Sequence, residues 1–196
     1  LPMLPRLPRP LERIASAVQH LHDMEVAHGS LKPSNILMDE AGDITLTDLS
    51  MATLRELGFV PDAPTRQHLL FMPPEREYHA APELVGDVFS LGVLAYLLLT
   101  GKMPFDDPDP EARGIIEPHD LSVEVAAVLR RELNPQLRFR YQTLAEFMLA
   151  LKPDAVEVNR EGQIFETKRV LIGLDGGKLA ADGAYQAIIH PAMVQS

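Results

Sequence analysis

The chain has 196 residues, enough for one domain and an appendage, and its apolar fraction of 46% allows a packed core. A formal net charge of −10 argues against nucleic acid or an anionic membrane surface as the main partner. Cysteine is absent, which excludes a disulfide framework and thiol catalysis, and the longest apolar run is about half a membrane span.

The first half of the chain predicts a connector, a helix and a hairpin. Residues 1–10 carry four prolines, so we expect a proline-rich connector there. Apolar residues at helical spacing follow from Leu11 to His22, with Pro10 suited to the first helical position. Two short apolar runs, Ile36–Met38 and Ile44–Thr47, flank a turn that contains Gly42 and predict a β-hairpin.

The second half predicts a helical domain. Residues 48–75 hold four prolines and few periodic apolar residues, so we expect mostly loop. Asp87–Thr100 is apolar nearly all round, which is typical of a buried helix, and Gly101 suits its C-cap. Residues 106–118 allow only a short helix near Asp109. Helices are expected over Leu121–Leu133 and after the capping box that begins at Thr143.

The pattern changes after Pro153. Short strand-like runs separated by glycines predict a β-rich arm or truncated module over 154–196; they are Val156–Val158, Gln163–Thr167, Arg169–Leu174 and Tyr185–Ile189. The expected domains are therefore a connector (1–10), a mainly helical domain (11–153) and this appendage (154–196).

Three polar residues lie where the predicted hairpin strands begin and end. Asn35 precedes the first strand and Asp48 follows the second, so their oxygen atoms can converge on one Mg²⁺ ion. Lys32, three positions before Asn35, can meet a phosphate group as a point charge.

These residues belong to a longer set of motifs that resembles the eukaryotic-type protein kinases. The sequence H-G-S-L-K-P-S-N from His28 to Asn35 is similar to the catalytic loop H-R-D-L-x-x-x-N. Four further landmarks follow in the family's order: Asp48-Leu49-Ser50 for D-F-G, Met72-Pro73-Pro74-Glu75 for A-P-E, Asp87–Gly92 for the start of the central helix, and Asn134–Arg138 for D-P-x-x-R. The resemblance spans roughly residues 7–152 and implies a kinase large lobe, α+β and mainly helical, with a small hairpin.

The resemblance also implies a role for each matching residue. Lys32 would contact phosphate, and Asn35 and Asp48 would bind the metal that accompanies ATP. Asp87 would hold the backbone of the catalytic loop, and His28 would be a packed structural histidine. Glu75 and Arg138 would form a buried ion pair, so that Arg138→Ala would cost about 3–5 kcal/mol.

Two departures from the family pattern point to inactivity. Ser30 stands where the family has its catalytic Asp, and loss of a general base costs roughly 10²–10⁴-fold in rate. Gly29 replaces the preceding Arg, which removes the usual grip on a phosphorylated activation segment. We also expect that the small lobe is not contained in this chain, because ten residues leave no room for it.

The sequence therefore predicts a pseudokinase large lobe that acts as a scaffold or assembly subunit, with other protein subunits as partners and no catalytic residue or required cofactor. We expect a soluble protein, on the cytoplasmic side, with no visible secretory signal. Two alternatives stay open: a protein Ser/Thr kinase whose small lobe lies outside the chain, and a nucleotide-binding regulatory domain. Both would use ATP and Mg²⁺ at Lys32, Asn35 and Asp48.

Overall fold

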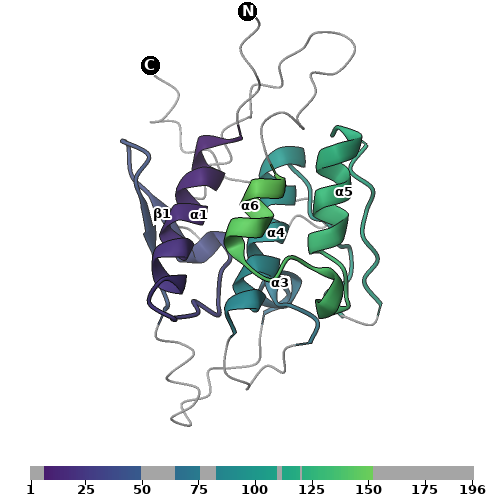
Figure 1. Ribbon diagram of the computed structural model, residues 1–196, viewed down its shortest axis with the longest axis horizontal. Coiled ribbons are helices and arrows are strands. Elements are labelled where there is room, and N and C mark those ends of the chain that lie inside the picture. Colours follow the sequence, from purple (N-terminus) through teal and green to yellow (C-terminus); the bar gives the residue numbers. More distant parts are fainter. Residues whose placement is uncertain (1–6, 50–64, 76–82, 110–111, 120, 152–196) are drawn as a thin grey trace, which may run out of the picture.

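The computed structural model describes residues 7–49, 65–75, 83–109, 112–119 and 121–151. Helices and two short strands form one mainly helical unit (Figure 1). The elements are α1 (Arg9–His22), the 3₁₀ turn η1 (Pro33–Asn35), β1 (Ile36–Met38), β2 (Ile44–Leu46), α3 (Arg66–Phe71), α4 (Leu84–Thr100), α5 (Val123–Glu132), η2 (Leu137–Phe139) and α6 (Leu144–Ala150).

Helix α4 is the centre of the core, as its sequence predicted. Every residue from Asp87 to Leu98 is buried, which agrees with a helix that lacks a polar face. The helix contacts α1, α3, α5 and α6, and Figure 1 shows it behind α6, between α1 and α5. Gly101 ends it in the left-handed conformation (φ 70°), where a glycine avoids the steric cost of a Cβ atom.

Helix α1 buries one apolar face against this core. The buried residues Leu11, Ile14, Ala15 and Val18 recur at the predicted spacing. The helix begins at Arg9, and Leu7 is only 5% exposed, so the packed unit starts inside the segment that was predicted to be a connector.

The predicted hairpin is present as an antiparallel pair in which Ile36 lies opposite Leu46. The backbone N–H of Thr47 donates to the carbonyl of Asn35 (2.9 Å), which extends the pairing to the residue before β1. Arg13 of α1 donates to Asp43 in the turn (2.6 Å) and ties the hairpin to the helix.

Helix α3 lies in a region that was predicted to be mostly loop. It has six residues and is capped by Thr65, whose side chain accepts from the N–H of His68 (3.2 Å). A helix this short shows no apolar period in the sequence, so tertiary contacts with α4 must supply its stability.

The two C-terminal helices are present where the sequence predicted them, although α5 begins at Val123 and not at Leu121. Ser122 caps α5, and the Thr143–Glu146 capping box opens α6. The described part of 106–118 contains a turn in which Ala112 and Arg113 bond to the carbonyl of Asp109, and no helix. The strands predicted over 154–196 lie outside the described residues, and no described helix is both long and apolar enough to span a bilayer.

Glu132 is a buried carboxyl group in this helical core. Glu132 is 0% exposed, and its Oε2 atom accepts from the backbone N–H of Tyr141 (3.2 Å). The other oxygen has no partner among the described residues. The side chain fits because α4 has a glycine opposite: a Cβ atom on Gly92 would lie 2.7 Å from Glu132 Cγ. Burial raises the pKa of Glu132 to about 8, although Arg140 and Arg131 oppose the shift.

This shift makes folding stability depend on pH. The folded state keeps a proton on Glu132 that the unfolded chain releases above pH 4.5, so the free energy of unfolding falls as pH rises to about 8. The loss is on the order of 4–5 kcal/mol. We expect Glu132→Gln, which keeps the acceptor for Tyr141, to flatten that slope in denaturant titrations across this range. Glu124→Gln, an exposed change on the same helix, should leave the slope as it is, and equal slopes in all three proteins would contradict the assignment.

Candidate functional site

Asp87 joins the buried helix α4 to the loop that begins at His28. Its two carboxylate oxygens accept from the backbone N–H groups of His28 (2.7 Å) and Gly29 (2.8 Å). Oδ2 also lies 3.1 Å from Nε2 of His22, at the end of α1. Hydrogen bonds from backbone N–H groups to a buried carboxylate are strong, so the helix fixes the start of the loop. This is the contact that the family resemblance implied for Asp87.

His28 packs inside the loop. The residue is 0% exposed, and its Nδ1 accepts from the N–H of Ser30 (3.3 Å). Burial lowers the pKa of His28, although the nearby Asp87 carboxylate opposes the shift. A neutral, buried imidazole suits the structural role that the sequence predicted, and it does not provide a base at the surface.

Asn35 holds Ser30. Its Nδ2 donates to the carbonyl of Ser30 (2.8 Å) and to the Ser30 hydroxyl (3.2 Å), while its Oδ1 accepts from Ser34 (3.2 Å). The Ser30 carbonyl can only accept, so the amide nitrogen must face it. Asn35 is 2% exposed, and its hydrogen bonds close the loop on itself.

Lys32 and Asp48 lie at the same loop, at different degrees of burial. Lys32 is half-buried, whereas Asp48 is exposed and has a positive φ of 61°. The Asp48 charge acts on His28, so the carboxylate is near the loop. The described residues contain no group of three or more His, Cys, Asp or Glu side chains that could hold a metal ion. The exposed Asp48 carboxylate and the Asn35 Oδ1, which accepts from Ser34, are the oxygen groups that the predicted Mg²⁺ site would use.

A small cavity of about 10 Å³ lies between this loop, α3 and α4. It has room for a single water molecule. Its lining is apolar, hydroxyl-bearing or basic and contains no carboxylate; the lining residues are Gly29, Ser30, Leu31, Lys32, His68, Phe71, Met72 and Ser90. Ser90 of α4 fixes one wall because its hydroxyl donates to the carbonyl of Phe71 (2.8 Å).

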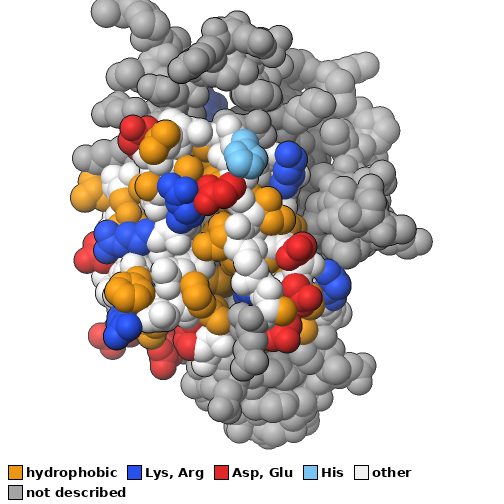
Figure 2. Space-filling model, turned by 90° about the vertical axis from the view of Figure 1, so that its right-hand side faces the viewer, with side chains coloured by type: hydrophobic (Ala, Val, Ile, Leu, Met, Phe, Trp, Pro, Cys, Tyr) orange, Lys and Arg blue, Asp and Glu red, His pale blue; other side chains and the backbone are white. Residues whose placement is uncertain are grey.

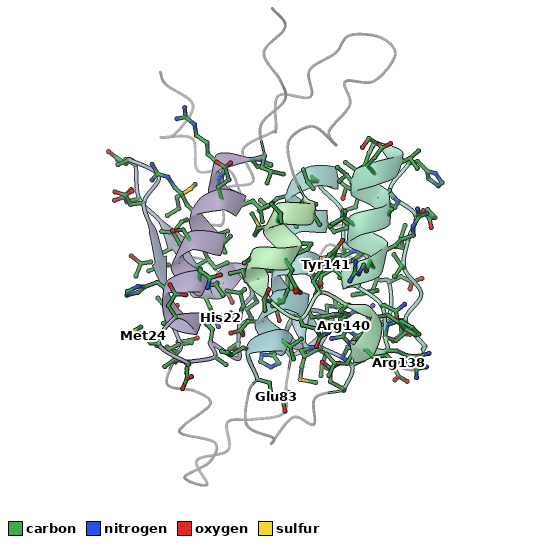
Figure 3. All side chains as sticks on the ribbon, viewed as in Figure 1. His22, Met24, Glu83, Arg138, Arg140 and Tyr141 are labelled. Atoms are coloured by element: carbon green, nitrogen blue, oxygen red, sulfur yellow. The ribbon has the colours of Figure 1, made fainter. Side chains whose placement is uncertain are left out.

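The predicted ion pair between Glu75 and Arg138 is wrong. Glu75 pairs with Arg140, whose two terminal nitrogens lie 2.9 and 2.5 Å from the carboxylate oxygens. The Arg140 side chain is 0% exposed and stacks over Phe89 of α4, whereas Arg138 is exposed and bonds to Gln136. Figure 3 shows Arg138 at the outer edge of the molecule and Arg140 further inside.

The conformation of the chain explains this exchange. Arg138 lies in the middle of the 3₁₀ turn η2, which places its side chain in solvent. Arg140 follows the turn in extended conformation, and it also donates to the carbonyls of Asn134 (2.6 Å) and Pro135 (3.1 Å). The motif spacing predicted that the first arginine of Arg138-Phe139-Arg140 is the buried one. Only the conformation of η2 decides which of the two arginines faces inward.

Arg113 is a positioning residue that the sequence did not indicate. Its guanidinium donates to the carbonyls of Leu69 and Met72 (3.1 Å each), at α3 and just after it. It also donates to the carbonyl of Pro108 (2.7 Å) and lies over the ring of Phe105. Arg66 adds a bond to the carbonyl of Asp106 (2.5 Å). Two arginines therefore hold α3 against the loop after α4.

Comparison with known proteins identifies one family over most of the chain. The sequence model described as "Protein kinase domain" matches residues 7–155. A second model, "Sporulation factor SpoIIGA", matches residues 131–193, which is less than half of the chain. Among curated relatives, the serine/threonine-protein kinase STY46 of Arabidopsis thaliana is 30% identical over 91% of this chain and 32% of its own length. The serine/threonine-protein kinase PrkC of Bacillus subtilis is 33% identical over 49% of this chain and 15% of its own length.

A solved structure supports the fold. The Cydia pomonella granulovirus kinase PK-1 matches with a TM-score of 0.56 and 20% identity, over 73% of this chain and 57% of the viral one. This confirms the predicted kinase-like fold. The chain spans a third or less of the two curated relatives named above.

The two arginines give a direct stability test. Arg140→Ala should lower the free energy of unfolding by about 3 kcal/mol, near the lower end for a broken buried ion pair, because Glu75 is 30% exposed and regains water. Arg138→Ala should change it by no more than about 0.5 kcal/mol, as for an ordinary surface substitution. Urea denaturation of both variants measures the difference, and a larger loss in Arg138→Ala would restore the original assignment.

Asn35 gives a second test, which separates a loop-holding amide from a metal ligand. Asn35→Asp replaces the donor that faces the Ser30 carbonyl with a carboxylate, so we expect a loss of about 1–3 kcal/mol. Adding Mg²⁺ should not restore the stability, although a carboxylate is the better ligand. Ser34→Ala, which removes only the contact to Asn35 Oδ1, serves as the mild control. Recovery of Asn35→Asp by Mg²⁺ in thermal denaturation would instead favour a metal site.

Proposed function

This chain belongs to the protein kinase family, and we propose that it is a catalytically inactive member, a pseudokinase whose large lobe serves as a protein-interaction scaffold. The observation that carries the proposal is Ser30, which stands at the general-base position and whose hydroxyl is bonded to the buried Asn35 amide.

The chemistry of that position argues against phosphoryl transfer. A serine hydroxyl does not accept a proton from a substrate hydroxyl at neutral pH, and a carboxylate there is worth roughly 10²–10⁴-fold in rate. The cavity beside Ser30 has no carboxylate in its lining to replace it. Asn35, the expected second metal ligand, holds the loop through its Nδ2, and its Oδ1 accepts from Ser34.

The absence of an arginine at position 29 supports the same proposal. In the family resemblance, this side chain would bind a phosphorylated activation segment, and Gly29 cannot. The described part of the corresponding segment is held instead by Arg113, Arg66 and the Glu75–Arg140 pair. These contacts need no phosphate, so the fold is stabilised without a phosphorylation step.

A rigid, inactive lobe suits a role in binding other proteins. We retain the division into a connector, a lobe and an appendage as part of the proposal, with the start of the lobe moved to the buried Leu7. We propose other protein subunits as its partners, not nucleic acid, given the net charge of −10.

The competing function is that of a Ser/Thr kinase, or of a nucleotide-binding regulatory domain. The names of the curated relatives favour it, since STY46 and PrkC are both serine/threonine-protein kinases. Lys32 and Asp48 are present at the positions that such a function would use.

A phosphotransfer assay on the protein at its natural length decides between these functions. We expect no transfer of labelled γ-phosphate to a generic Ser/Thr peptide above the level of an Asp48→Ala control. We also expect no Mg²⁺-dependent thermal shift with ATP, whereas ligand at ~100 times Kd adds about 2.7 kcal/mol of apparent stability. Transfer that Asp48→Ala abolishes would establish the kinase. A Mg²⁺-dependent shift without transfer would establish the nucleotide-binding domain.

A further inference from the structure

Arg131, Arg138, Phe139 and Tyr141 form a continuous surface where α5 ends and the chain turns towards α6; we call it the arginine–aromatic patch. The Arg138 guanidinium lies 4.7 Å from the centroid of the Phe139 ring, and that of Arg131 lies 4.1 Å from the Tyr141 ring. Arg131 Nε donates to the carbonyl of Phe139 (3.2 Å), which links the two stacked pairs.

The aromatic parts of the patch differ in exposure. Phe139 is 49% exposed, whereas Tyr141 is 8% exposed and its ring lies beneath the Arg131 guanidinium. Both arginines are exposed. Figure 2 views the molecule from the side that lies on the right in Figure 1, where α5 is placed, and shows basic and apolar side chains close together on the described surface.

The charge of the patch is opposite to that of the chain. The chain has 28 acidic and 18 basic residues, yet neither Arg131 nor Arg138 forms an ion pair with a carboxylate in the described ranges. The neighbouring Arg130, by contrast, pairs with Glu117 (3.0 Å). Since Arg140 takes the buried pair with Glu75, Arg138 has no core role, and its guanidinium faces solvent.

Stacking prepares these guanidiniums to bind a carboxylate. A guanidinium over a ring face has its N–H groups directed outward in its own plane, so they can reach a carboxylate with two parallel hydrogen bonds. Bonds to Gln136 and to the Phe139 carbonyl limit the rotamers of both side chains, so less entropy is lost on binding. Arginine and aromatic residues, phenylalanine included, are also enriched at protein interfaces relative to the rest of the surface.

We propose that the arginine–aromatic patch is the docking surface for an acidic segment of a partner protein, whose carboxylates bind Arg131 and Arg138 and whose backbone or apolar side chains cover Phe139. The proposal rests on the proposed scaffold function, because it names the chemistry of the partner that such a scaffold would hold. Opposite charge selects this partner over a basic or neutral one.

A labelled oligoglutamate peptide is the probe, titrated by fluorescence anisotropy into the protein at its natural length and at an ionic strength of about 0.15 M, where weak long-range attraction is screened. We expect saturable binding, and no binding of an oligoserine peptide. Arg131→Gln combined with Arg138→Gln should weaken binding by at least about tenfold, and Phe139→Ala should also weaken it. Each single variant, Arg131→Gln or Arg138→Gln, is matched by Arg9→Gln, which also removes one positive charge, on an exposed site of α1 on the opposite side of the molecule in Figure 1; Arg9→Gln should bind like the wild type.

Charge reversal makes the test independent of lost folding. The double variant Arg131→Glu, Arg138→Glu should lose the binding of oligoglutamate and gain the binding of oligolysine. The single variant Arg138→Glu should keep the melting temperature of the wild type. If the wild type does not bind oligoglutamate, or if Arg9→Gln weakens binding equally, the docking proposal is overturned. Phosphotransfer activity with normal patch behaviour would overturn only the proposed function, so the two failures are distinguishable.

Discussion

The Asp87 carboxylate is the contact on which the site depends. It lies on the most buried helix and accepts from two successive backbone N–H groups of the loop, and the position of the loop is therefore set by the core. Leaving these N–H groups unpaired inside the protein would cost about 1–3 kcal/mol each, so the two hydrogen bonds fix the start of the loop. The loop geometry is thus a property of the fold.

A second set of contacts, built from arginines, holds the segment that leads from α3 to Glu75. Arg140 reaches Glu75 from the far side of the domain, and Arg113 binds the carbonyls of Leu69 and Met72 from the loop after α4. Each of these guanidiniums satisfies several acceptors at once and also stacks on a phenylalanine, so charge and packing act together.

Asn35 and Arg138 show what the structure adds to the roles that the family resemblance implied. Asn35 is present at the position of a metal ligand, yet its amide bonds to Ser30, the residue that replaced the base. Arg138 is present at the position of a buried structural arginine, yet it stacks on Phe139 at the surface. Asn35 Nδ2 donates to the Ser30 carbonyl, a backbone group that any residue at position 30 offers, whereas Arg138 is left without its predicted partner because Arg140 pairs with Glu75.

The sequence by itself determined the elements whose stability is local or whose burial is uniform: the apolar α4 with Gly101 at its end, the amphipathic α1, the capping box of α6 and the hairpin. It also determined the family and the Asp87 contact, through motifs at fixed spacing. Only the tertiary structure decided that Arg140 replaces Arg138 in the ion pair, that α3 forms, that Arg113 binds it and that Glu132 is buried opposite Gly92. These features depend on which way a side chain faces after a turn, or on a partner far along the chain, and neither local propensity nor spacing carries that information.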